Sequence, residues 1–271
     1  FGSPVAIVGA VLSYGDITFD SNANKVVVVI SNYSNSGRGE AYVGTVSGTS
    51  ISFGSAVVFE TSTDTRWPAA TFDSNTNKVV VAYDAESGGF GGRAIVGTVS
   101  GNSISFGPSV ALSESSPSYT RATFDSNSNK VVLVYKEGYP SNAGVALVGT
   151  VSGNSISFGS PTSFVNLLQY YPGVAIDSSS KMVVAYRDPG NSSYGTAKVG
   201  TISGTSISFG SAVVFESVNA PYTTEAIFDS SANKFLIAYT DYTNTPVGKI
   251  IKGTVSGTSI SFASPVVFDS P

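Results

Sequence analysis

The stretch from Ala70 to Phe106 reads ATFDSNTNKVVVAYDAESGGFGGRAIVGTVSGNSISF. Nearly the same text occurs five times along the 271-residue chain. The Gly of its GT(V/I)SG segment recurs every 51 to 53 residues, as Gly44, Gly97, Gly149, Gly200 and Gly253. A fixed period of this length predicts repeated units, each of which buries its apolar faces against its neighbours.

Each repeat contains four strand-like segments. In the second repeat, a short apolar segment (69–72) is followed by a turn rich in Asn and Ser (73–77) and by the β-branched run 78–83. A polar, Gly-rich loop (84–92) leads to a third strand (93–99), a tight turn and a fourth strand that begins at 104. Four strands in a repeat of about 50 residues are typical of a β-propeller blade.

The run 78–83 is apolar on both faces instead of alternating, which indicates a sheet covered on both sides. A β-sandwich would leave one face wet and show clearer alternation, and a parallel β-helix would need shorter coils. The sequence therefore predicts an all-β, five-bladed β-propeller with four antiparallel strands per blade and a repeat of about 52 residues.

We expect one domain, 1–271, with blades at about 8–59, 60–112, 113–164, 165–215 and 216–268. Residues 1–7 and 262–268 are both copies of the half-strand 53–59. We expect 262–268 to complete the fourth strand of the last blade. Residues 1–7 are then a surplus half-strand at the seam of the ring, where the two ends meet.

The composition excludes several classes of function. The chain has no Cys and no His, so disulfides, thiol nucleophiles and a Ser-His-Asp triad are impossible. Charged residues make up 12% and the net charge is −4, without a basic patch for nucleic acid. No apolar run approaches the roughly 20 residues of a membrane span. We predict no cofactor, no nucleic-acid partner and no membrane insertion.

One motif partly matches a metal site. Asp73-x-Asn75-x-Asn77 resembles the first half of an EF-hand calcium loop, but Lys78 stands where that loop requires Gly. We predict no metal, and interpret the motif as a hairpin in which Asp and Asn bond their own backbone.

The repeats differ from one another in only some of their connections. The turns between first and second strands and between third and fourth strands are nearly uniform; we call them the uniform turns. The loops between second and third strands, and those between consecutive repeats, differ in sequence; we call them the variable loops. In an up-and-down meander all variable loops leave from one end of the sheets, which favours that end as the functional face. Relaxed drift of exposed loops is the alternative.

Every variable loop contains an aromatic residue. Aromatic rings offer rigid apolar platforms with a polar edge, on which the C–H face of a sugar stacks, and charges of both signs suit hydrogen bonds to hydroxyls or carboxylates. The alternative is that these aromatic rings fill gaps between blades. For Tyr171 we weigh gap-filling and sugar binding equally. The predicted ligand-binding residues are Tyr14, Asp16, Arg66, Trp67, Phe90, Tyr119, Arg121, Tyr139, Tyr171, Tyr194, Tyr222, Glu225 and Tyr242.

Catalysis remains an alternative. Glycoside hydrolases need two carboxylates about 5–10 Å apart, and Asp16 and Glu225 would be neighbours where the last blade meets the first. Two carboxylates are weak support, so we expect no enzyme and assign no catalytic residue.

The run GTVSGTSISFGSAVVF (44–59) resembles the propeller repeats of secreted, surface-adhesive and phage-fibre-like bacterial proteins. The five-fold architecture also resembles five-bladed lectins of the tachylectin-2 type, in architecture only. The resemblance implies a secreted or cell- or virion-surface protein that binds glycans or cell-surface polysaccharide. We expect a monomeric lectin or adhesin, with several sites on one ring. The alternatives are a glycoside hydrolase-like enzyme and a structural or interaction module of a larger surface or fibre protein.

Overall fold

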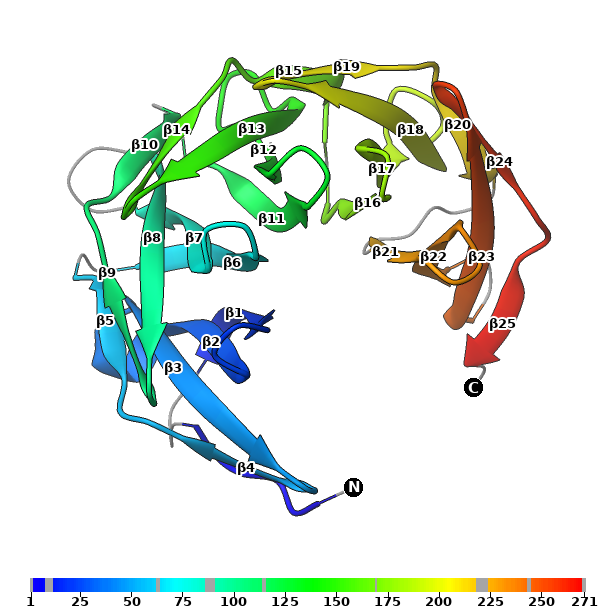
Figure 1. Cartoon of the computed structure of the whole chain (residues 1–271). Helices are drawn as coiled ribbons and strands as arrows, with labels where there is room; N and C mark the ends of the chain where they lie inside the picture. The colour runs from blue at the N-terminus through cyan, green and yellow to red at the C-terminus, as the bar shows by residue number, and fades with distance from the viewer. Residues whose placement is uncertain are drawn as a thin grey trace. The chain divides into compact units, whose positions relative to one another are not determined.

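The computed structural model describes residues 2–7, 12–61, 64–85, 91–113, 116–168, 170–217, 224–242 and 245–269. Within these residues the protein is all-β, with one short 3-10 helix, η1 (Tyr33–Asn35). No helix among them is long and apolar enough to cross a membrane. Figure 1 labels the strands along the chain.

The strands form five antiparallel sheets, numbered here in chain order. Sheet 1 contains β1 (Leu12–Asp20), β2 (Lys25–Asn32), β3 (Arg38–Ser47), β4 (Ser50–Phe53) and β5 (Val57–Glu60). Sheet 2 contains β6 (Thr65–Asp73), β7 (Lys78–Ala85), β8 (Gly92–Ser100), β9 (Ser103–Phe106) and β10 (Val110–Ser113). Sheet 3 contains β11 (Ser118–Asp125), β12 (Lys130–Lys136), β13 (Gly144–Ser152), β14 (Ser155–Phe158) and β15 (Thr162–Val165).

Sheet 4 contains β16 (Gly173–Ile176), β17 (Lys181–Asp188), β18 (Tyr194–Ser203), β19 (Ser206–Phe209) and β20 (Val213–Glu216). Sheet 5 contains β21 (Thr224–Asp229), β22 (Lys234–Asp241), β23 (Val247–Ser256), β24 (Ser259–Phe262) and β25 (Val266–Asp269). In each sheet the last two short strands pair with the same third strand, as β4 and β5 both pair with β3. They are two halves of one fourth strand, so the prediction of four antiparallel strands per repeat is confirmed.

The chain divides into two compact units, which are described separately below. Unit 1 comprises Phe1–Phe124, Asn129–Val131 and Gly149–Phe158, and unit 2 comprises Asp125–Ser128, Val132–Val148 and Gly159–Pro271. The division passes through the third repeat, whose β13 pairs with β14 in unit 1 and with β15 in unit 2.

In unit 1 the core lies between sheets 1 and 2. Val27 and Val29 of β2 form one buried cluster with Val81 and Tyr83 of β7 and Ile95 of β8. Val81 and Tyr83 are completely buried. The β-branched runs therefore pack sheet against sheet, as the apolar pattern of residues 78–83 predicts.

In unit 2, sheet 4 is covered on both faces. Met182 and Val184 of β17 belong to a buried cluster with residues of β12, β13 and β15. The alternate residues Val183 and Ala185 belong to a second cluster with sheet 5, including Phe235. Because successive side chains of a strand point to opposite faces, β17 is buried on both sides, which explains why its sequence does not alternate.

The uniform turns have the geometry expected of the D-S-N motif. In sheet 2 the Asp73 Oδ1 accepts hydrogen bonds from the backbone N–H of Asn75 (2.9 Å) and of Thr76 (3.1 Å). Asn77 takes the left-handed conformation with φ 56°. The carboxylate thus satisfies the turn's own backbone, and the hairpin interpretation is confirmed.

The two copies of the half-strand at the chain ends differ in their partners. Val266–Asp269 (β25) pairs with β23 and completes the fourth strand of sheet 5, as expected. Gly2 approaches Thr49 in sheet 1, where a Cβ would lie 1.9 Å from the carbonyl oxygen. Phe1 lies outside the described residues, and the two ends belong to different units, so their meeting at one seam stays a prediction.

Candidate functional site

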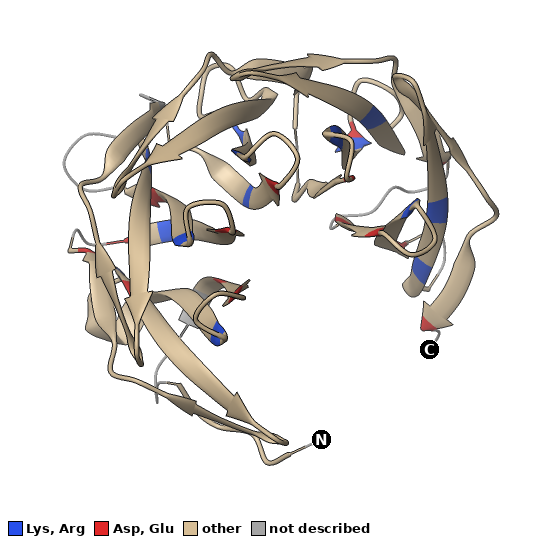
Figure 2. Ribbon diagram, viewed as in Figure 1, with Lys and Arg blue, Asp and Glu red and all other residues tan. Residues whose placement is uncertain are grey.

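The variable loops leave each sheet from one end. Within sheet 1 the antiparallel order of β1, β2 and β3 places the loop after β2 and the start of β1 at the same end, opposite the uniform turns. The same order recurs in sheets 2, 4 and 5. Figure 2 shows acidic and basic residues only as short, separate segments of these sheets, so the chemistry of this end depends on a few individual side chains.

Unit 1 brings together three of the predicted aromatic residues. The Tyr14 and Trp67 rings lie 4.0 Å apart between centroids, and the Trp67 and Tyr119 rings lie 4.7 Å apart. They stand at the beginnings of β1, β6 and β11. We call these three side chains the aromatic row. The first pair is tilted and the second is edge-to-face, so the three rings form one cluster and not three separate platforms.

The backbone of the aromatic row is unusual. Trp67 and Tyr119 have φ angles of 51° and 57°, in the left-handed region that bulky residues rarely adopt. In β6 the pairing with β7 shifts between Arg66 and Ala69, which marks a bulge at Trp67. Such conformations cost on the order of 1–3 kcal/mol and occur where surrounding contacts or function maintain them.

Two predicted charged residues lie beside the aromatic row. The carboxylate of Asp16 accepts hydrogen bonds from the backbone N–H of Ala70 (2.9 Å) and of Ile17 (2.8 Å). Burial raises the pKa of Asp16 above its usual value, although these bonds and the positive charge of Arg121 act in the opposite direction. Asp16 therefore ties sheet 1 to sheet 2. Arg66 instead forms an ion pair with Asp64.

The other predicted residues are dispersed. Tyr139 is 88% exposed and Tyr242 is 39% exposed, whereas Tyr194 and Tyr171 are half-buried. The backbone carbonyl of Tyr171 accepts a hydrogen bond from Thr224 Oγ1 (3.2 Å). Phe90 and Tyr222 lie outside the described residues. Glu225 is exposed in unit 2 and Asp16 belongs to unit 1, so their pairing as catalytic carboxylates stays a prediction.

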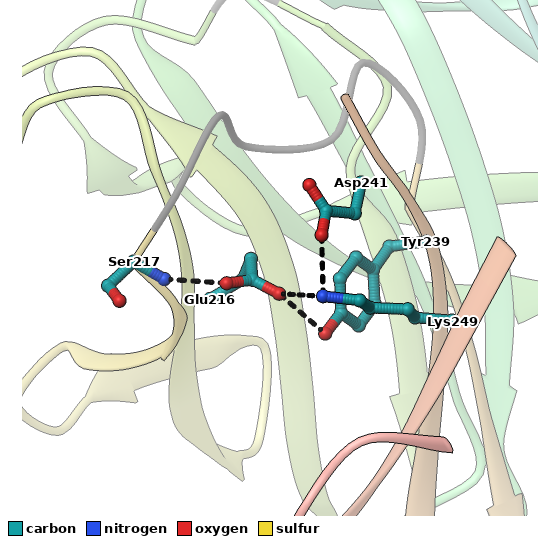
Figure 3. A network of polar contacts seen from close by, with 5 residues as sticks. All are labelled: Glu216, Ser217, Tyr239, Asp241 and Lys249. Carbon is teal, nitrogen blue, oxygen red and sulfur yellow. Dashed lines mark hydrogen bonds and ion pairs between the residues drawn. The ribbon is translucent and has the colours of Figure 1, made fainter. Parts of the chain in front are cut away.

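Between sheets 4 and 5, the end with the variable loops holds a buried polar network (Figure 3). Glu216 Oε2 accepts hydrogen bonds from the Tyr239 hydroxyl (3.0 Å) and from Lys249 Nζ (3.1 Å). Lys249 Nζ also lies 2.5 Å from Asp241 Oδ2. Burial lowers the pKa of Lys249, but its hydrogen bonds to the two carboxylates outweigh burial and raise the pKa above its usual value. Lys249 thus serves as the shared cation of two carboxylates.

The corresponding place between sheets 1 and 2 is also filled. The Tyr83 hydroxyl donates to Glu60 Oε2 at 3.1 Å. Burial, then the charge of Glu60, raises the pKa of Tyr83, and the charge of Arg93 opposes that rise. In the strand register Tyr83 faces Arg93, as Tyr239 faces Lys249. A Glu, a Tyr and a basic residue thus close both inter-sheet spaces.

Between sheets 3 and 4, wholly within unit 2, this arrangement is missing and a pocket of about 510 Å³ takes its place. Val165 at the end of β15 occupies the position that Glu216 occupies at the end of β20. Thr196, which faces Tyr186, occupies the position that Lys249 occupies opposite Tyr239. The pocket is lined by Ser163, Phe164, Val165, Asn166, Leu167, Tyr186, Asp188, Pro189, Gly190, Asn191, Lys198 and Ala212.

The polar groups of this pocket are available to a ligand. The Tyr186 hydroxyl and Lys198 Nζ form no hydrogen bond or ion pair within the described ranges. Asp188 Oδ1 accepts one hydrogen bond, from the backbone N–H of Gly190 (3.0 Å). Burial, then the charge of Asp188, raises the pKa of Tyr186, so its hydroxyl stays protonated at neutral pH. A residue that can donate, one that can accept and a cationic residue therefore line one pocket.

No single sequence motif marks these pocket residues. Comparing the repeats by position would have found Lys198, because it lies two residues before Gly200, where the other repeats carry Tyr42, Ile95, Leu147 and Ile251. None of the predicted aromatic residues that the structure describes lines the pocket.

No protein-family model matches the sequence, and no curated protein sequence matches it either. Solved structures do resemble the fold. A Dyadobacter fermentans protein of unknown function is 9% identical over 96% of this chain and 95% of its own, with a TM-score of 0.60. A putative glucose dehydrogenase of Thermus thermophilus is 12% identical over 97% of this chain and 85% of its own, with a TM-score of 0.59.

A third similar structure is the fucose-recognising lectin of Aleuria aurantia, a six-bladed β-propeller. It is 12% identical over 96% of this chain and 79% of its own, with a TM-score of 0.55. These similarities support a β-propeller fold built from repeated four-stranded sheets. They do not extend to the adhesive repeat family that the sequence resembles.

Proposed function

We propose that this protein is a carbohydrate-binding module, a lectin or adhesin, whose five sheets close into a five-bladed propeller. The variable loops form its binding face. The observation that carries this proposal is the open pocket between sheets 3 and 4, which Tyr186, Asp188 and Lys198 line together.

The pocket has the size and the mixed lining that a sugar requires. Its volume of about 510 Å³ falls in the range of small-molecule sites, about 300–1,000 Å³. Phe164, Val165 and Leu167 supply apolar surface for the C–H groups of a sugar ring. Asn166 and Asn191 add amide groups for its hydroxyls.

The aromatic row supplies a second surface for the same class of ligand. Tyr14, Trp67 and Tyr119 form one aromatic cluster beside the charges of Asp16 and Arg121. Two weak sites on one molecule increase the avidity for a polymeric glycan without any new contact. The proposed partner is therefore a glycan chain or polysaccharide at a cell or virion surface, bound by a secreted or surface-displayed monomer.

Binding without catalysis fits the carboxylates better than hydrolysis does. Both oxygens of Asp16 accept backbone hydrogen bonds, which supports a structural more than a catalytic role for this carboxylate. The similarity to a fungal fucose lectin is compatible with the proposal at the level of fold.

The test combines a glycan array with titration calorimetry on the wild-type protein and the Asp188→Asn variant. We expect binding in the millimolar range or tighter, and a loss of about tenfold in Asp188→Asn, because a carboxylate is a stronger acceptor than an amide. Ser74→Ala, in a uniform turn at the opposite end of sheet 2, is the control and should bind normally. Absence of binding to every glycan at millimolar concentration would reject the proposal.

A further inference from the structure

We infer that the pocket between sheets 3 and 4 selects an acidic sugar, a uronic acid unit whose carboxylate is bound by Lys198. This inference rests on the proposed function above and adds the class of ligand. Three observations carry it: the position of Lys198 in the sheet, the lack of a partner for its ammonium among the described residues, and the carboxylate of Asp188, which forms no salt bridge with it.

Lys198 occupies a core position of the repeat. It faces Val184 in the register of β17 and β18, as Ile95 faces Val81 in sheet 2 and Ile251 faces Ile237 in sheet 5. Ile95 and Ile251 are 5% and 2% exposed. A Lys at such a position moves an ammonium toward the space between two sheets, where an unpaired charge is unfavourable. Packing alone would favour an aliphatic residue here.

The ammonium of Lys198 forms no ion pair or hydrogen bond to any residue that the structure describes. Lys249, by contrast, contacts two carboxylates at 3.1 and 2.5 Å. Four of the lysines that begin second strands donate to a threonine of the third strand, as Lys181 Nζ does to Thr201 Oγ1 at 2.9 Å. Lys198 is therefore a half-buried cation. A ligand that enters the pocket can supply its counter-charge.

Asp188 does not neutralise Lys198. The two residues line the same pocket, but they form no salt bridge. Asp188 occupies the position of Asp241, whose partner is Lys249, but in sheet 4 the residue that would supply the cation is Thr196. The pocket thus keeps a cation and an anion apart, and each is open to a separate group of a ligand.

A uronic acid satisfies both charges. Its carboxylate pairs with Lys198, and its ring hydroxyls donate to Asp188. A neutral sugar leaves Lys198 without a counter-charge. The gain from one charge-assisted hydrogen bond to a partly buried ammonium corresponds to about tenfold in affinity.

The experiment compares pairs of methyl glycosides that differ only at C6: the glucuronide with the glucoside, the galacturonide with the galactoside and the mannuronide with the mannoside. Each is titrated calorimetrically into the wild-type protein and into Lys198→Met and Lys198→Arg. Lys252→Met, which removes an exposed lysine of sheet 5, is the matched control. Thermal melting verifies that each variant is folded.

We expect one uronide to bind the wild-type protein about tenfold more tightly than its neutral partner. Lys198→Met should abolish this preference and retain binding of the neutral sugar, Lys198→Arg should retain part of the preference, and Lys252→Met should behave as wild type. Added NaCl should reduce the preference in the wild-type protein, which is a readout that does not require a variant to fold.

The outcomes separate the two proposals. If neutral sugars bind as tightly as uronides and Asp188→Asn weakens them, the pocket is a neutral-sugar site; the inference is then wrong and the proposed function stands. An unchanged uronide preference in Lys198→Met also overturns the inference. If no glycoside and no arrayed glycan binds, both proposals fail.

Discussion

Gly54 lies against the carbonyl oxygen of Asn102, so closely that a Cβ on Gly54 would be 1.9 Å from that oxygen. This approach brings the fourth strand of sheet 1 onto the turn between the third and fourth strands of sheet 2. The same relationship joins Gly107 to Asn154, with 2.0 Å, and Gly210 to Thr258, with 1.9 Å. Sheet 5 carries Ala263 at the corresponding place in its sequence.

Gly54→Ala should destabilise the protein by about 1–3 kcal/mol, because the methyl group must displace a neighbouring backbone. The free energy of unfolding from urea titration measures the effect. Ser55→Ala, which changes an exposed neighbour in the same segment, is the control. A change within about 0.5 kcal/mol for Gly54→Ala would contradict the close approach.

Val81→Ala should cost about 1–3 kcal/mol, because Val81 is completely buried between sheets 1 and 2 and the substitution leaves a cavity. Ile17→Ala is the comparison, since Ile17 is 61% exposed and its removal should change the stability by less than about 0.5 kcal/mol. Equal effects in urea titrations would refute the assignment of Val81 to the layer between the sheets.

Lys249→Met should destabilise the protein by about 1–3 kcal/mol, because it leaves Glu216 and Asp241 without their shared cation. The pKa of Lys249 is raised in the folded state. Its contribution is therefore complete below the ordinary lysine pKa and is lost as the pH rises through the raised value. Stability measured against alkaline pH should fall more steeply in the wild type than in Lys249→Met. Lys252→Met is the exposed control, and identical slopes would argue against the network.

Tyr83→Phe and Tyr186→Phe should have opposite consequences. The Tyr83 hydroxyl donates to Glu60, so its removal should cost about 1 kcal/mol of stability and leave sugar binding unchanged. The Tyr186 hydroxyl lines the pocket and lacks a protein partner within the described residues. Its removal should leave the melting temperature unchanged and weaken sugar binding. Thermal melting and calorimetry on both variants provide the check, and a destabilised Tyr186→Phe would indicate a bond inside the protein.

The repeat architecture could be predicted because it depends on local patterns. The β-branched runs 78–83 and 181–186 specify strands covered on both faces, and Asp73 specifies a turn through its own carboxylate. Among the candidate site residues, Tyr14, Trp67, Tyr119, Asp16 and Arg121 do lie together in unit 1. Their contact with one another was not predicted, because it depends on the bulge at Trp67 and on the spacing of neighbouring sheets.

From the sequence alone we could predict the period, the four strands of each repeat and the end of the sheets at which the loops vary. These features follow from hydrophobic pattern and turn chemistry within about 50 residues. The place where a pocket opens could not be predicted in this way, because it depends on how neighbouring sheets pack. Between sheets 3 and 4, Val165 and Thr196 occupy the positions that Glu216 and Lys249 occupy between sheets 4 and 5, where the carboxylate and the ammonium form an ion pair. Two separate sequence segments line the space between two sheets, so its charge balance appears only when both are packed together.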